Sequence, residues 1–333
     1  MKSFNVGILG ATGAVGREMM NILEERNFPI GELRLLASER SVGKKITFKG
    51  EEIEVKLAEP NAFKGLDIVL GAASNAVAKE LAPYIVKAGA VFVDNSSAFR
   101  MNDDVPLVIP EINAEDVKKN KGIISNPNCS TIITLVAVNA INQLSKIKGM
   151  IASTYQATSG AGAGGPVELR QQMEAILNGG EIKNEVFVHQ IAENVIPHIG
   201  SFNDNGYTAE EMKMQNEGRK ILHLPELNVT CTCVRVPVVR SHSISVTVLT
   251  EDKLSVSQVR DAVANAKGCK LYDNGEAKEY PMPIVTSDQD LVYVGRIRED
   301  LVFDNAITLW CCGDQVRKGA ATNAIQIAEE LIK

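Results

Sequence analysis

A turn with three regularly spaced glycines follows the first apolar run of the chain, and it constrains the fold more than any other feature. The apolar run is Phe4–Leu9, and the turn is Gly10-Ala11-Thr12-Gly13-Ala14-Val15-Gly16. Apolar residues at helical spacing follow as far as Leu23, and 33–37 is predicted to form a second strand. A strand, a turn, a helix and a strand of these lengths make a β-α-β unit.

Glycines in such a turn let the backbone approach a pyrophosphate closely, and the helix N-terminus stabilises the negative charge. The spacing is G-x-x-G-x-x-G instead of the usual G-x-G-x-x-G, so the motif gains its weight from its place between a strand and a helix. A tight turn without a ligand is the alternative. We predict a dinucleotide site with contacts from Gly10, Thr12, Gly13, Ala14, Val15 and Gly16.

Strand-like and helical segments alternate beyond this unit. Further strands are predicted at 68–71, 91–94 and 123–125, with a helix at 75–87. This alternation indicates an α/β fold with a doubly wound, parallel, Rossmann-type sheet. After residue 148 the pattern changes to separated helices and runs of antiparallel-type strands, including 229–239 and 243–250, which predicts a second domain of the α+β class.

The last predicted helix, 318–332, is expected to return to the first domain, because a lone terminal helix needs a sheet face to bury against. The expected domains are therefore 1–128 plus 314–333, which would bind the dinucleotide, and 129–313.

Composition excludes several classes of function. The chain has 333 residues and a formal net charge of -6, so it presents no broad basic surface for nucleic acid. No apolar stretch reaches the ~18 residues that a membrane span needs, and no signal peptide is expected. The six cysteines are scattered in a way that fits neither a disulfide framework nor a metal site. We expect reduced thiols in a cytoplasm, no bound metal, and simple packing of Cys231 and Cys233 on one buried strand face.

The end of the second predicted strand distinguishes between cofactors. A site that prefers NAD usually places a carboxylate there for the ribose hydroxyls. This chain has Ser38, Arg40 and Ser41, which suit a 2′-phosphate, with Arg40 covering the adenine. Glu39 is the opposing observation, because it offers a carboxylate for the ribose. We predict NADP.

A single cysteine ends a turn stiffened by proline. The stretch is Asn126-Pro127-Asn128-Cys129-Ser130-Thr131, and a mostly apolar segment with helical spacing follows at 131–144. The dipole and free N–H groups of a helix N-terminus favour thiolate over thiol, and a thiolate is a nucleophile for acyl chemistry. A buried structural cysteine is the alternative.

Acyl chemistry also needs an acid or base and groups that orient the substrate. His242 is predicted at the end of a strand, and Gln156 at a strand end just before the glycine-rich loop 159–165. Taken singly, each has an ordinary alternative, a structural histidine and a surface glutamine.

Four charged residues are candidates for substrate contacts. Arg100 follows a strand, at the edge where parallel sheets bind ligands. Arg235 lies on a predicted strand and suits a bidentate grip on a carboxylate. Glu210 and Lys213 lie three residues apart on one helix face, which by itself fits a solvated ion pair.

Taken together and in order, six segments resemble the aspartate-β-semialdehyde dehydrogenase family over essentially the whole chain. They are Gly10–Gly16, Ser38–Ser41, Asp94–Arg100, Asn126–Thr131, Gln156–Gly160 and Arg235–His242. The resemblance implies that Cys129 is the nucleophile, His242 the acid or base, and Gln156 a group that orients the substrate.

The resemblance also implies the binding residues. Arg235 and Glu210 would hold the carboxylate and amino groups of the substrate, while Arg100 and Lys213 would bind phosphate. The remaining expected contacts are Asn128 for substrate and Ser74, Ser159, Gly160, Gly162 and Gln315 for cofactor. Choosing Glu210 over Glu211 rests on its three-residue step to Lys213.

The implied enzyme is a cytoplasmic homodimer, or a tetramer of such dimers, whose second domain is catalytic and forms the dimer. It reduces β-aspartyl phosphate to the semialdehyde for lysine, diaminopimelate, threonine and methionine synthesis. An N-acetyl-γ-glutamyl-phosphate reductase shares this chemistry and is the first alternative. A non-catalytic dinucleotide sensor and a cysteine hydrolase using Cys129 and His242 are alternatives from other classes.

Overall fold

The computed structural model describes residues 2–333, which form two compact units. The first unit runs to Asn128 and resumes with Ala320–Lys333, and the second is Cys129–Gly319. The expected domains placed the return to the first unit at residue 314. In the structure it comes at Ala320, inside the π-helical turn Arg317–Ala321. Within the described residues, no helix is long and apolar enough to cross a membrane.

The first unit is built on a parallel sheet with the strand order β5-β2-β1-β6-β7-β8. The strands are β1 (Phe4–Leu9), β2 (Ile30–Ala37), β5 (Lys56–Leu57), β6 (Ile68–Gly71), β7 (Val91–Asp94) and β8 (Ile123–Ser125). A separate hairpin pairs β3 (Lys45–Phe48) with β4 (Glu51–Glu54). The order reverses direction at β1, as in doubly wound folds, so the predicted Rossmann-type sheet is confirmed.

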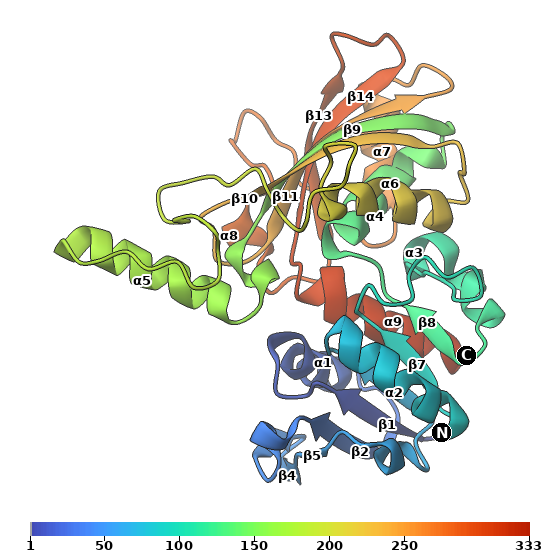
Figure 1. The fold of residues 1–333 in the computed structure, drawn as a ribbon. Helices are drawn as coiled ribbons and strands as arrows, with labels where there is room; N and C mark the ends of the chain where they lie inside the picture. The colour runs from blue at the N-terminus through green and yellow to red at the C-terminus, as the bar shows by residue number, and fades with distance from the viewer. Residues whose placement is uncertain (1) are drawn as a thin grey trace. The chain divides into compact units, whose positions relative to one another are not determined.

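Helices cover both faces of this sheet because successive strand residues point to opposite sides. They are α1 (Ala14–Glu25), α2 (Asn75–Lys87), α3 (Pro110–Asn113) and α9 (Thr322–Leu331). Ile8 and Leu35 pack with α1 and α9 in one core, whereas Leu9 and Leu36 pack with α2 in the other. The C-terminal helix therefore joins the first unit, as the sequence predicted (Figure 1).

The second unit contains a mixed sheet with the order β10-β9-β11-β14-β13-β12. The strands are β9 (Ile147–Gln156), β10 (Asn228–Arg235), β11 (His242–Thr250), β12 (Cys269–Leu271), β13 (Val292–Glu299) and β14 (Ala306–Gly313). The helices are α4 (Cys129–Asn142), α5 (Gly164–Asn178), α6 (Ala209–Ile221), α7 (Val256–Asn265) and α8 (Pro283–Thr286). Helix α4 packs against β9, β11, β13 and β14, α6 packs against β10, and α5 projects away from the sheet (Figure 1).

Two expectations for the second unit are corrected. The sheet is not uniformly antiparallel, because β10 pairs with β9 and β12 pairs with β13 in parallel. The strand predicted over 229–239 ends at Arg235, where Pro237 interrupts the chain, since proline cannot donate to a ladder. The α+β class itself is confirmed.

Candidate active site

Two strands end and a third begins at one edge of the second unit's sheet. Gln156 ends β9, Arg235 ends β10, and His242 begins β11. Arg235 pairs directly with Gln156, and Ser243 pairs with Tyr155. Residues opposite each other in register share a face of the sheet. The Gln156, Arg235 and His242 side chains therefore lie side by side, all buried.

His242 opens β11 instead of ending the preceding strand, which corrects the sequence-based expectation. Its Nδ1 accepts a hydrogen bond from the Ala157 backbone N–H at 3.0 Å. Its Nε2 has no hydrogen-bond partner within residues 2–333. Burial, followed by the nearby positive charge of Arg235, lowers the pKa of His242 to about 3. The ring is therefore neutral in the folded protein near pH 7.

The Arg235 guanidinium is held by the residue that also holds His242. Its Nη1 donates a 2.6 Å hydrogen bond to the Ala157 carbonyl oxygen, and the guanidinium lies 5.8 Å from the centre of the Phe187 ring. Burial lowers the pKa of Arg235, while the charges of Cys129 and Glu210 act in the opposite direction. Its Nε has no protein partner in the described part of the chain. A buried guanidinium with such a free donor suits a carboxylate.

The first turn of α6 brings Glu210 to this group. Gln156 Nε2 donates to the Glu210 carboxylate at 3.3 Å, and Lys213 Nζ lies 2.7 Å from its other oxygen. Gln156 is itself fixed by a 3.0 Å bond from the Thr154 hydroxyl to its amide oxygen. Glu210 and Lys213 thus form the i, i+3 ion pair that the spacing allowed, and the pair is joined to Gln156.

Glu211 has a different task. Its carboxylate accepts the Thr208 backbone N–H at 2.7 Å, completing a capping box at the start of α6. Its other oxygen accepts the backbone N–H of Cys233 at 3.0 Å. Glu211 therefore anchors the helix to β10, and Glu210 is the residue that the helix presents to Gln156.

Cys129 is the first residue of α4, two residues before the segment predicted to be helical, and it is only half-buried. The other five cysteines are buried, with Cys231 and Cys233 on one strand and 3.8 Å between their sulfurs. The helix N-terminus and the Arg235 charge both favour a thiolate at Cys129.

The glycine-rich loop after β9 lies against the same side chains. A Cβ added to Gly160 would lie 2.8 Å from Arg235 Nη1 and 3.1 Å from His242 Nε2, so a side chain there would have to displace the Arg235 guanidinium. Ser159 accepts a hydrogen bond from Gln315, whose amide oxygen accepts the Ser241 backbone N–H at 2.8 Å. Gly162 has a φ of +88° and no neighbour that a Cβ would meet within 4 Å. Three residues thus lie close to His242: Ser159, Gly160 and Gln315. Gly162 instead provides the left-handed backbone conformation that the loop needs.

In the first unit, the glycine turn closes tightly onto α1. A Cβ on Gly16 would lie 2.3 Å from the Gly10 carbonyl oxygen, and one on Gly10 would lie 2.4 Å from the Ala72 carbonyl oxygen. Gly13 caps α1 without a side-chain hydrogen bond, and the first turn carries no acidic residue. The turn, with Thr12, Ala14 and Val15 on it, is therefore shaped to accept an anion.

Hydroxyl groups gather beside this turn. Thr12 and Ser41 hydroxyls lie 3.2 Å apart, and Ser38 precedes the short 3-10 helix Glu39–Ser41. Arg40 is exposed on that helix, and so is Glu39. Ser74 caps α2, where its hydroxyl accepts the Val77 N–H at 3.5 Å.

Arg100 and the residues before Cys129 are fixed within the first unit. Arg100 is buried, and its guanidinium donates to the carbonyl oxygens of Asn126 and Asn95 at 2.9 and 2.7 Å. Asn126 accepts a 2.6 Å hydrogen bond from Asn323 of α9. Asn128 is buried at the end of this unit.

Four contributors to the second unit's site were not predicted. They are Thr154, Ala157, Phe187 and Gly319, where an added Cβ would lie 3.0 Å from the Cys129 Cβ. The Thr154 position, two residues before Gln156 on one strand, places it on the same face. Ala157 acts through its backbone, Phe187 through its ring, and Gly319 through the space left by its missing side chain. No sequence pattern indicates these contacts.

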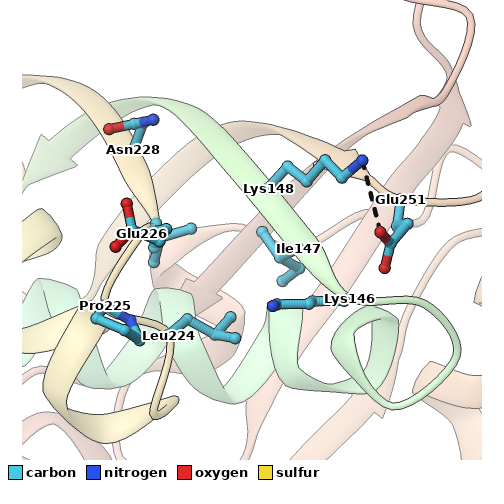
Figure 2. Close-up of a pocket in the computed structure, with 9 residues that line it drawn as sticks. Lys146, Ile147, Lys148, Leu224, Pro225, Glu226, Asn228 and Glu251 are labelled. Carbon is cyan, nitrogen blue, oxygen red and sulfur yellow. Dashed lines mark ion pairs between the residues drawn. The ribbon is translucent and has the colours of Figure 1, made fainter.

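A pocket of about 360 Å³ lies elsewhere in the second unit, at the opposite end of β9 from Gln156. Figure 2 shows Lys146 and Glu226 on its walls and the exposed ion pair of Lys148 with Glu251, 3.7 Å long. None of the predicted site residues lines it.

Comparisons with known proteins agree with this arrangement. The family model described as "Semialdehyde dehydrogenase, NAD binding domain" matches residues 5–120, and "Semialdehyde dehydrogenase, dimerisation domain" matches residues 138–318. An aspartate-semialdehyde dehydrogenase from Aquifex aeolicus is 52% identical over 334 residues, covering 99% of this chain and 98% of the relative. The chain belongs to the aspartate-semialdehyde dehydrogenase family.

Solved members of the aspartate-semialdehyde dehydrogenase family share the fold. The structure of aspartate semialdehyde dehydrogenase II from Vibrio cholerae complexed with ASA has a TM-score of 0.97 at 44% identity, covering 100% of this chain and 99% of that one. A Candida albicans structure with NADP has a TM-score of 0.77 at 26% identity, with 99% of each chain covered. The resemblance seen in the sequence and the oxidoreductase class are thus confirmed.

Proposed function

We propose that this protein catalyses the reversible, NADPH-dependent reductive dephosphorylation of β-aspartyl phosphate to aspartate β-semialdehyde through a thioester on Cys129. The observation that carries the proposal is the grouping of Gln156, Arg235, His242 and Glu210 in the unit that Cys129 opens. Full-length relatives with this activity in their names support it.

The cofactor site fits NADP. The cradle at Gly10 and Gly16, which a Cβ would fill, and the uncapped start of α1 suit a pyrophosphate. Ser38, Arg40 and Ser41 suit a 2′-phosphate, and no carboxylate other than the exposed Glu39 lies on that short helix. When bound, NADPH supplies the hydride that reduces the thioester. Ser74, Ser159, Gly160, Gly162 and Gln315 are further proposed contacts.

Cys129 performs the acyl transfer. Its thiolate attacks the carbonyl carbon of the acyl phosphate, and the carbonyl electrons move to oxygen. Hydrogen-bond donors near the start of α4 stabilise that oxyanion. When the carbonyl re-forms, the C–O bond to phosphate breaks and the acyl group remains on sulfur. After reduction, the thiohemiacetal collapses with His242 managing the proton, the C–S bond breaks, and the aldehyde and the thiolate are freed.

Charged side chains recognise the amino acid. The Arg235 guanidinium holds the α-carboxylate, and Glu210 attracts the α-amino group. Gln156, bonded to Glu210, orients the substrate. Arg100 and Lys213 are proposed to bind its phosphate, and Asn128 is a further proposed substrate contact.

The proposed assembly is a homodimer, or a tetramer of dimers, in the cytoplasm. The sheet face of the second unit turned away from α4 and α6 exposes Ile151 and Tyr155, and the Tyr155 ring lies 5.3 Å from that of Trp310. Exposed large apolar side chains on a sheet face suit contact with a second copy of the chain. Light scattering of the purified protein measures its oligomeric state directly.

The deciding experiment runs the reaction in reverse. NADP and aspartate β-semialdehyde should yield NADPH only when inorganic phosphate is present. N-acetylglutamate semialdehyde in the same assay distinguishes the longer-chain reductase, because Glu210 favours a free amino group. Activity on the acetylated substrate alone contradicts the proposal, as does NADPH formation that does not depend on phosphate.

A further inference from the structure

We propose that Glu168 and Phe187 are positioning residues for Arg235. The Glu168 carboxylate holds the backbone of the loop 183–192, and the Phe187 ring on that loop supports the Arg235 guanidinium. The inference deepens the proposed reaction and rests on it, because Arg235 is proposed to hold the α-carboxylate of the substrate. It gives a role to a buried carboxylate that no step of the reaction uses.

Glu168 is a buried carboxylate on α5, and it is only 4% exposed. Three successive backbone N–H groups of the loop point at it. Glu185 donates at 2.8 Å and Val186 donates to the same oxygen, while Phe187 donates to the other oxygen at 3.3 Å. A buried charge needs such partners, and hydrogen bonds to an ionised acceptor are about twice as strong as neutral ones. The carboxylate therefore fixes the backbone of 185–187 against α5.

Gln172, one turn further along α5, holds the rest of this loop. Its amide oxygen accepts the backbone N–H groups of Ile191 and Ala192 at 2.8 and 3.1 Å. Its Nε2 donates to the Lys183 carbonyl oxygen at 2.9 Å, and the side chain is buried. Two buried polar side chains of one helix thus fix the loop at its start, in its middle and at its end.

The Phe187 ring faces the Arg235 guanidinium, whose Cζ lies 5.8 Å from the ring centre. That distance is within the ~6 Å range of a cation–π contact. A Cβ added to Gly165 would lie 3.2 Å from the ring's own Cζ, so the first turn of α5 also packs against the ring. The ring further contacts the apolar cluster that contains Leu169 and Ile191. Its backbone and its ring are both held, so Phe187 has little freedom to move away from Arg235.

An aromatic ring suits this position because it leaves the guanidinium available to the substrate. Arg235 is buried, its Nη1 donates to the Ala157 carbonyl oxygen, and its Nε has no protein partner in residues 2–333. Burying a cation is costly unless its charge is compensated. A protein carboxylate would compensate it but would occupy the N–H donors that the substrate carboxylate needs. The face of a ring attracts the cation and leaves those donors free.

The first test is a double-mutant cycle between Phe187 and Arg235. Phe187→Leu keeps an apolar side chain but removes the ring, so we expect the KM for semialdehyde to rise about 3- to 30-fold with kcat nearly unchanged. In the Arg235→Ala protein the same substitution should change kcat/KM by less than about twofold, because the ring then has no cation to support. Phe202→Leu, at an exposed phenylalanine of the same unit, is the matched control. An unchanged KM in Phe187→Leu, a fall in kcat alone, or a full effect without Arg235 overturns the inference.

The second test measures the contribution of Glu168 without any turnover. Glu168→Gln replaces one carboxylate oxygen by an NH₂ group, which cannot accept the N–H groups of the loop. Hydrogen–deuterium exchange of the full-length protein should become about tenfold faster or more at the amides of 185–187, because hydrogen bonds to a charged acceptor are lost. Glu174→Gln, at an exposed position of the same helix, should leave their exchange unchanged. Unchanged exchange in Glu168→Gln overturns the inference.

The KM for semialdehyde connects the two steps. Glu168→Gln should raise it in the otherwise wild-type protein and change it little in the Phe187→Leu protein, since both residues act through one ring. Additive effects would mean that α5 influences the site by another route, and they overturn the inference. The Phe187 cycle decides if Glu168→Gln fails to fold. NADPH formation by the wild type with and without phosphate tests the proposed reaction separately.

Discussion

Gly319 faces Cys129 so closely that a Cβ added to it would lie 3.0 Å from the Cys129 Cβ. The two residues are 190 positions apart, yet they meet at the start of α4 and in the π-helical turn Arg317–Ala321. That separation is a few tenths of an ångström shorter than ordinary van der Waals packing, so a side chain at 319 must displace either Cys129 or the turn that carries residue 319.

We therefore expect Gly319→Ala to lower kcat by about 3- to 10-fold, because a 1 Å displacement of a reacting group costs about 10²-fold and the contact here requires a smaller shift. The KM for semialdehyde should change less, since Arg235 and Glu210 are untouched. Gly275→Ala is the matched control, because a Cβ there meets nothing within 4 Å. Steady-state kinetics on both variants make the comparison, and equal rates in the two would show that Cys129 is not constrained by Gly319.

Cys129→Ser should reduce turnover by roughly 10³-fold or more, because serine forms its alkoxide far less readily near pH 7 than cysteine forms a thiolate. The variant should still bind NADP, which fluorescence titration measures. Turnover near that of the wild type would remove the thioester from the mechanism.

Iodoacetamide should label one thiol per chain rapidly. Cys129 is half-buried, whereas burial raises the pKa of Cys311 and of Cys312 and keeps both as thiols. Mass spectrometry after brief exposure should find the label on Cys129, and substrate should protect it. Rapid labelling of a buried cysteine, or no protection by substrate, would contradict the assignment.

Substitutions at Glu210 and at Glu211 should have different effects. Glu210→Gln removes the charge that faces Gln156 and Lys213, so we expect a KM for semialdehyde raised about tenfold with little change in stability. Glu211→Ala removes the capping box and the bond to the Cys233 backbone, so we expect a loss of about 1–2 kcal/mol in the free energy of unfolding with KM unchanged. Urea denaturation and steady-state kinetics on both variants measure these effects. A stability loss for Glu210→Gln together with a raised KM for Glu211→Ala would mean that Glu211, and not Glu210, contacts the substrate.

The sequence predicts those features that are carried by local patterns. The glycine turn and the apolar runs predicted β1 and α2 with their bounds, and the turn before Cys129 predicted the start of α4. The step from Glu210 to Lys213 selected the glutamate that contacts Gln156. The T-x-x-E spacing of Thr208 and Glu211 is a further signal, because it marks a helix start.

Other features depend on pairing across the chain. Parallel pairing of β10 with β9 is invisible in either strand alone, yet it places Arg235 beside Gln156. Ala157 acts only through its backbone N–H and carbonyl, which every non-proline residue has. Gly319 acts through the side chain it lacks. Such contacts depend on the three-dimensional fold, and the residue types involved do not predict them.

Arg40 should set the choice of cofactor. It is exposed beside Ser38 and Ser41 at the end of β2, and a 2′-phosphate is the anion that distinguishes NADP from NAD. Arg40→Ala should raise the KM for NADP about tenfold, because a charge-assisted contact is lost. The KM for NAD should stay unchanged. A wild-type preference for NAD of tenfold or more would overturn the NADP assignment, because Glu39 would then be the ribose ligand.

The buried neutral His242 should make stability depend on pH. Its folded-state pKa of about 3 lies below the ordinary value, so the unfolded chain binds the proton first as pH falls. The stabilising contribution is thus complete above pH ~6.5 and is lost progressively toward pH 3. Between pH 7 and pH 5 the loss should be about 2 kcal/mol. Urea unfolding of the wild type and of His242→Asn at both pH values isolates the contribution of His242 to the free energy of unfolding. The carboxylates titrate in both proteins, so their contribution cancels in the difference. An equal pH dependence in the two proteins would mean that His242 carries a proton in the folded state, and the ring would then be free to act as an acid.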